Sequence, residues 1–130
     1  MSDLTIEQEI QAKGLTAPRI TPDDIEANIL SEDYFTAQHA VNGSPNKIGF
    51  KQSEGKYTPV FDDARHQALS LLTFCVLVLK NGFTVTGESA CASPENFDAE
   101  LGNKIARQNA VNKIWPLMGY ELKSKLEGIK

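Results

Sequence analysis

The sequence predicts an α+β fold built from a hairpin and a helix that are adjacent in the chain. A hairpin is expected at about residues 71–89, because two strand-forming runs flank Asn81-Gly82, the preferred two-residue turn. A long helix is expected at about residues 94–115, where start and stop signals bound a helical pattern. An additional N-terminal helix is expected at about residues 22–33. We therefore expect a small antiparallel sheet that is built on the hairpin and packed by the long helix.

The composition is that of one globular domain of modest size. The chain has 130 residues, of which 41% are hydrophobic, and this suffices for a single core. Its formal net charge of -4 argues against strong DNA binding, which depends on neutralising phosphates. The two cysteines, Cys75 and Cys91, are expected to be buried or inert thiols in a reducing compartment.

Two features bear on where the protein acts. The longest apolar run, Leu71 to Leu79, is too short to span a bilayer. The acidic N-terminal sequence MSDLTIEQEI lacks the apolar core of a signal peptide. We therefore expect no membrane association and an intracellular location.

The first 20 residues hold a weak helical pattern from Leu4 to Lys13, in which Ile6 and Ile10 are spaced by four. This stretch is open to three interpretations: a packed helix, a partner-binding arm or a frayed tail, since termini with few anchors are usually mobile. The domain organisation that we expect is a flexible arm at residues 1–20 and a single α+β domain at residues 21–130.

A helix start is clear in the segment Thr-Pro-Asp-Asp at residues 21–24. The Thr21 hydroxyl can accept from N–H groups of the first turn, and Pro22 suits the first helical position. The two aspartates complement the positive end of the helix dipole. Because Ile25 and Ile29 then lie on one stripe, the helix is expected to continue to about residue 33.

The segment from Asn42 to Asp63 is expected to be a loop-rich insertion. Glycine and proline residues interrupt it repeatedly, and lysines lie between them. A short exposed hairpin within this segment is the alternative, with a weak signal. A loop of this length inside a compact domain is either functional or flexible.

A two-residue turn determines which residues of the hairpin strands are paired. Leu79 is expected to face Thr84, and Leu77 to face Thr86. Side chains alternate along each strand, so one face carries Phe74, Val76, Val78, Phe83 and Val85. We expect this apolar face to pack against the long helix. The opposite face, apolar on one strand and polar on the other, is expected to be a subunit contact or a pocket wall.

The long helix has signals at both ends. Ser93 is a suitable N-cap and Pro94 a suitable first residue, while Pro116 is expected to prevent continuation. At about 100° per residue, one stripe carries the apolar residues Phe97, Leu101, Ile105 and Trp115. Gln108 and Asn112 fall in the same stripe. Because buried amides need hydrogen-bond partners, these two are either polar bridges in the core or groups that line a pocket.

No catalytic constellation is present. His39 and His66 have no carboxylate or cysteine at metal-ligand spacing. Cys91 has no base close in sequence that would activate a thiol. The acidic residues near the start of the long helix are better explained as cap and dipole groups. We therefore expect a protein that is not an enzyme, with no metal and no cofactor.

The loop at residues 87–94 is a candidate anion site, because small residues let a ligand approach the backbone. A helix N-terminus offers free N–H groups and a positive dipole end, which suit phosphate. Lys104, Arg107 and Lys113 project from later turns of the helix. Against this site, Ser93 occupies N–H groups as a cap, and basic residues on later turns are usually a solvated face.

Several motifs together resemble a phage family. They are NGF, ESACASPENFD and NKIWPLMGY, with PRITPDDIEANI upstream. In these motifs the chain resembles the phage gene-49/gene-66-like family, named after genes of a coliphage and of a Shigella phage. The resemblance covers about residues 17–126. Most of that family has no assigned activity.

The core also resembles the first type of Thoeris anti-defence protein. Those phage proteins share an NGF hairpin, a Ser/Cys-rich loop, an Asn-aromatic-Asp helix start and a KIW segment. They are oligomeric, non-enzymatic sponges that bind cyclic ADP-ribose isomers made by bacterial TIR-domain proteins, and some also hold cyclic oligonucleotides. The resemblance implies that this chain sequesters a nucleotide signal of host defence.

The same resemblance implies a set of ligand-binding residues. Phe83 would stack on adenine, and Asn96 would hydrogen-bond the base or the ribose. Arg107 and Lys113 would contact the pyrophosphate. Beyond what the resemblance implies, we also expect Ser89, Gln108 and Asn112 to bind the ligand.

We thus expect a non-catalytic phage protein that acts in the host cytoplasm as a homo-oligomer and sequesters a cyclic nucleotide signal. The alternative is an accessory protein that binds and modulates a host protein. A nucleotide-degrading enzyme ranks last, because the sequence offers no base or metal set for it.

Overall fold

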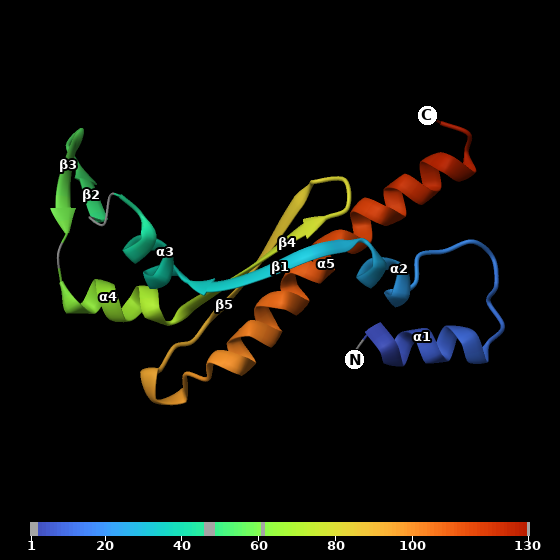
Figure 1. Cartoon of the computed structure of the whole chain (residues 1–130), viewed down its shortest axis with the longest axis horizontal. Helices are drawn as coiled ribbons and strands as arrows, with labels where there is room; N and C mark the ends of the chain where they lie inside the picture. Colours follow the sequence, from blue (N-terminus) through green and yellow to red (C-terminus); the bar gives the residue numbers. More distant parts are fainter. Residues whose placement is uncertain (1–2, 46–48, 61, 130) are drawn as a thin grey trace.

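The computed structural model describes residues 3–45, 49–60 and 62–129. Its elements, labelled in Figure 1 except for the short turn η1, are α1 (Asp3–Ala12), α2 (Pro22–Ala27), β1 (Ile29–Thr36), α3 (Ala37–Gly43), β2 (Gly49–Ser53), β3 (Lys56–Val60), α4 (Asp63–Ser70), β4 (Leu72–Leu79), β5 (Thr84–Ala90), η1 (Pro94–Asn96) and α5 (Ala99–Leu126). The main sheet has the order β1-β4-β5 and is antiparallel throughout. The expected α+β fold is confirmed.

Figure 1 shows how the remaining elements are distributed around the main sheet. The long helix α5 crosses one side of the sheet, while α3, α4 and the β2–β3 ribbon extend beyond one end. The helices α1 and α2 lie near the other end, on the side where both chain termini are found. The main sheet and α5 therefore form the central body of the protein.

The N-terminal helix of the main domain is shorter than the expected span 22–33. Thr21 caps α2 as expected, by accepting from the Asp24 backbone N–H at 3.1 Å. The helix ends at Ala27 with Asn28 as its C-cap, and the residues from Ile29 onward form strand β1. Pairing with β4 provides hydrogen bonds that override the local helical pattern of this segment.

The expected register of the hairpin is wrong by one residue. The loop has three residues, because the Leu79 N–H donates to the Phe83 carbonyl at 2.8 Å and the Gly82 N–H donates to Leu79. Gly82 has a φ of 89°, as the last residue of a three-residue hairpin loop requires. Leu77 consequently pairs with Val85 and not with Thr86.

The face of the central strand that packs on α5 is also the opposite of the expected one. Cys75, Leu77 and Leu79 are buried, whereas the residues that alternate with them in β4 remain partly exposed. Since opposite residues of paired strands share a face, Val85 lies with Leu77 on the α5 side. The prediction that Phe74, Val76 and Val78 pack on the long helix is therefore wrong.

The long helix differs from its expected span 94–115 at both ends. Ser93 precedes only the short turn η1 and makes no capping bond, while Asp98 caps α5 by accepting from the Leu101 N–H at 3.0 Å. The helix continues through Pro116 to Leu126. Pro116 has no N–H to donate, but it lies on an exposed part of the helix, where water can serve the carbonyl left without a donor.

The core lies between the main sheet and α5. Its buried members are Ile25, Cys75, Leu77, Leu79, Val85, Ala106, Ala110, Val111 and Ile114. The helix approaches β5 closely at Gly87, where an added Cβ would collide with the backbone of Ala106 and Ala110. Small residues on both sides thus set the distance between helix and sheet.

The segment that was expected to be a loop-rich insertion, 42–63, carries the separate two-stranded sheet β2–β3 within its described part. Residues 46–48 and 61 of this segment lie outside the described residues. The helices α3 and α4 were not expected from the sequence. Their signals are nevertheless present, since Thr36 caps α3 and Asp62 caps α4 through the backbone N–H groups three residues later.

Candidate functional site

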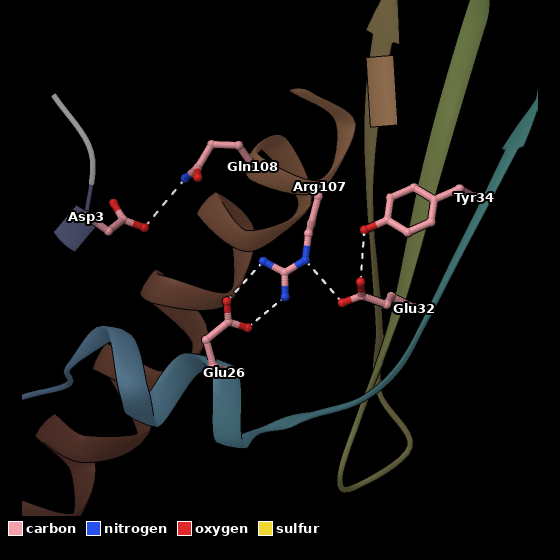
Figure 2. Close-up of polar contacts among 6 residues, drawn as sticks. All are labelled: Asp3, Glu26, Glu32, Tyr34, Arg107 and Gln108. Carbon is pink, nitrogen blue, oxygen red and sulfur yellow. Dashed lines mark hydrogen bonds and ion pairs between the residues drawn. The ribbon is translucent and has the colours of Figure 1, made fainter. Parts of the chain in front are cut away.

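Arg107 is the most connected of the predicted ligand-binding residues. Its guanidinium donates to both carboxylate oxygens of Glu26, at 3.0 and 2.7 Å, and its Nε donates to Glu32 at 3.1 Å. Figure 2 shows these bonds, which join α5 to α2 and to β1. The hydroxyl of Tyr34 donates to the other oxygen of Glu32 at 3.1 Å.

The charges in this cluster stabilise the protonated guanidinium of Arg107. The hydrogen bonds from Arg107 to Glu26 raise the pKa of the guanidinium further, and those to Glu32 add to the effect. Burial and the bond to Glu32 raise the pKa of Tyr34, which therefore stays neutral. Two carboxylates surround one cation, so an anionic ligand would have to displace an existing partner. Arg107 serves here to link three elements.

Gln108, Asn112 and Lys113 lie on the exposed surface of α5. The Gln108 amide donates to Asn112 at 2.8 Å and reaches Asp3 of α1 at 3.5 Å. Figure 2 shows the contact between Gln108 and Asp3. Neither amide is a core bridge, because the buried stripe of α5 runs through Ala106 and Ala110 instead.

The aromatic residue of the predicted set is at the far end of the hairpin. Phe83 is 56% exposed beside the turn and lines a shallow groove with Leu117 and Met118 of α5. Ser89 and Asn96 lie elsewhere, and both line a cavity of about 130 Å³ near the start of α5. The seven predicted residues therefore lie in several separate places, with Ser89 and Asn96 together in one cavity.

A different surface stands out in the structure: the side of the main sheet that faces away from α5, called here the open face. Cross-strand pairing assigns to it Ser31, Asp33 and Phe35 of β1, Phe74, Val76 and Val78 of β4, and Thr84, Thr86 and Glu88 of β5. Although β4 is the central strand, its three residues on this face are only partly buried. The Phe35 and Phe74 rings stack with centroids 5.7 Å apart.

The polar residues of the open face are acidic or hydroxylic. Asp33 and Glu88 are exposed, and Glu88 accepts from the Thr86 hydroxyl at 3.4 Å. The nine residues include no lysine, arginine or histidine. The open face is thus an apolar stripe with an acidic residue on each edge strand.

The apolar β4 residues of the open face were expected in the core, because the two-residue turn placed Phe83 and Val85 on the same face. A signal of the true arrangement was present. The run from Leu72 to Leu79 is almost entirely apolar on both alternating faces, as is typical of a strand covered on both sides. One helix can cover only one of those faces.

Among the described residues, no group of three or more histidine, cysteine, aspartate or glutamate side chains could hold a metal ion. Burial raises the pKa of the Cys75 thiol, which leaves it in its unreactive form. The Cys91 thiol donates to the Ser93 carbonyl at 3.1 Å. Within the described part of the chain, no helix is both long and apolar enough to cross a membrane.

Comparison with known protein families identifies a relationship for most of the chain. The model of a family described as "Phage protein (N4 Gp49/phage Sf6 gene 66) family" matches residues 20–126. No curated protein and no solved structure matches the chain. The matched span contains the main sheet, α5 and the open face, and it leaves out α1.

Proposed function

Because the chain belongs to the N4 Gp49/phage Sf6 gene 66 family of phage proteins, we propose that it is a non-catalytic accessory protein that binds a host protein through the open face. The observation that carries this proposal is the partial exposure of Phe74, Val76 and Val78 in the central strand of the sheet. Apolar residues gathered on one exposed surface are typical of protein interaction sites.

Charge indicates what kind of surface the open face accepts. Asp33 and Glu88 lie on the two outer strands, and the apolar residues of β4 lie between them. A partner segment with an apolar ridge and flanking lysine or arginine residues complements this arrangement. Two copies of the same face would bring carboxylates together with no cation of that face between them, so a host partner fits better than a second copy.

Site-specific photo-crosslinking tests the proposal. A photoreactive residue is placed at Val76 in the middle of the open face, and separately at Phe83, which is exposed and apolar but lies at the hairpin tip. In cells of the bacterial host, we expect a host protein to be crosslinked from position 76 and not from position 83. The crosslinked segment of that protein should carry basic residues beside its apolar ones.

Two results would overturn this proposal. One is crosslinking from position 83 alone, which would place the interface at the hairpin tip. The other is a crosslink from position 76 to a second copy of this chain, which would make the open face a homo-oligomer contact. Absence of any crosslink from position 76 would also count against the open face.

A second candidate function is sequestration of a cyclic nucleotide signal in the host cytoplasm, which the resemblance to Thoeris anti-defence proteins implies. The observation that favours it is the shared cavity of Ser89 and Asn96. It ranks second because Arg107 is held by Glu26 and Glu32. Thermal unfolding with cyclic ADP-ribose isomers and cyclic oligonucleotides tests it, since a tight ligand in excess raises stability by a few kcal/mol. No shift with any member of the panel would exclude those ligands.

A further inference from the structure

The cavity near the start of α5 has an unusual inner end. Of the residues that line it, Thr73 is the one that is buried, with 2% of its surface exposed. Its hydroxyl oxygen has no hydrogen-bond partner among the described residues. Buried polar groups are nearly always paired, so an unpaired hydroxyl beside a cavity needs an explanation. A bound group that enters the cavity is one.

Gly102 provides the space next to this hydroxyl. A Cβ at position 102 would lie 3.2 Å from the Thr73 hydroxyl oxygen, closer than ordinary van der Waals contact. Gly102 is within α5, and glycine is, after proline, the least favourable residue in a helix interior. A helix former at this position would support α5 better but would narrow the cavity.

The outer walls are apolar. Phe97, Leu101 and Ile105 line the cavity, and the last two are 55% and 45% exposed in the free protein. Ser89, Asn96 and Asp98 are among the other lining residues, and the negative charge of Asp98 disfavours an anionic ligand. The volume of about 130 Å³ is close to that of an engineered cavity, about 150 Å³, that binds benzene.

From these features we propose that the cavity binds an uncharged six-membered ring with a hydrogen-bonding edge, of the kind found in pyrimidine bases, and that Thr73 is its inner polar contact. The apolar walls receive the ring faces, and the Thr73 hydroxyl, which can donate or accept, meets the edge. The inference does not rest on the open face, and it holds whether the ring is free or is the end of a larger ligand.

NMR chemical shifts of the backbone amides, measured while uracil is added, test the inference. Uridine and uridine monophosphate serve as larger ligands, and benzene serves as a ring without a polar edge. Uracil is expected to shift the amides of Ser89 and Gly102. Thr73→Val keeps the shape of the side chain but removes the hydroxyl. It should weaken the binding of uracil about tenfold and leave the binding of benzene unchanged. Gly102→Ala should weaken both.

The variants separate binding from folding. Thr73→Val removes an unpaired buried hydroxyl, so its thermal stability should equal or exceed that of the wild type. If uridine binds as tightly as uracil, the cavity holds the ring end of a larger molecule. If uracil binds and uridine does not, the ligand is a free base. The inference is overturned if uracil leaves the cavity amides unshifted, or if Thr73→Val binds uracil as the wild type does.

Discussion

Arg107 of α5 and Glu26 of α2, 81 residues apart in the chain, form an ion pair in which two guanidinium nitrogens meet two carboxylate oxygens. The same guanidinium also binds Glu32 of β1 (Figure 2). One side chain thus holds together a short helix, an edge strand and the long helix. The arrangement explains how α2, with only Ile25 buried, stays attached to the core.

Replacing Arg107 with leucine is expected to lower the free energy of unfolding by about 1 kcal/mol. The figure is modest because Glu26 is 53% exposed and its charge is screened by solvent. Urea denaturation measures the change. Lys104→Leu, which removes an exposed pair with Glu100, is the control and should stay within about 0.5 kcal/mol of the wild type. Equal effects of the two changes would show that the Arg107 cluster stabilises the fold no more than an exposed ion pair does.

Gly87 and Gly119 are expected to respond to alanine in opposite directions. A Cβ at Gly87 meets the backbone of Ala106 and Ala110, which cannot move without separating α5 from β5. Gly87→Ala should therefore cost about 3 kcal/mol or more. At Gly119, also in α5, an added Cβ meets nothing within 4 Å, and alanine should stabilise by about 0.5–1 kcal/mol. Thermal unfolding measures the stability of both variants. A Gly87→Ala variant as stable as the wild type would contradict the close packing of α5 on β5.

The register of the hairpin makes a prediction for neighbouring residues of β4. Leu77 is fully buried under α5, so Leu77→Ala should cost about 2–5 kcal/mol. Val76→Ala on the open face should cost less than about 1 kcal/mol, because Val76 is partly exposed and loses a smaller area. Chemical denaturation of the two variants distinguishes the faces. The reverse order would place Val76, and not Leu77, against α5, as was expected from the two-residue turn.

Attachment of α1 is expected to depend on pH through Glu7. The hydrogen bond from Arg19 lowers the pKa of Glu7 from 4.5 to about 2. Because the folded-state pKa lies below the unfolded one, the contact stabilises above about pH 4.5 and is lost as the pH falls toward 2. Trp115, the one tryptophan of the chain, donates to Asp3 of α1 at 3.1 Å and reports the change through its fluorescence. Glu7→Gln should remove most of this dependence, and an unchanged pH profile in that variant would assign it to another group.

The fold class could be predicted from local signals, whereas several details depend on long-range contacts. Asn81-Gly82 identified the hairpin, but the same dipeptide occurs in two-residue and three-residue loops, so it could not decide the register. Local rules predict that a helix stops before Pro116, because they do not include the packing of the rest of α5, which continues through this exposed position. Ile29 fits a helix locally and becomes a strand residue only by pairing with Leu79.

Less of the candidate site than of the fold could be predicted from the sequence. The carboxylates that occupy Arg107 are 81 and 75 residues away, and no local pattern links them to it. The open face was hidden because a shift of one residue in the hairpin exchanges the faces of β5 relative to β4, and this placed Val85 beside Val78 in the expected register. Ser89 and Asn96 do share a cavity, since both flank the loop that leads into α5.

Affinity measurement with the host protein identified by crosslinking tests the central claim most directly. Calorimetric titration would compare the wild type with Val76→Ser on the open face and with Phe83→Ser at the hairpin tip. If the partner binds on the open face, Val76→Ser should weaken binding at least about tenfold, because a central apolar contact is lost. Phe83→Ser should change the affinity less than about twofold. Binding that survives Val76→Ser but is lost in Phe83→Ser would contradict the account.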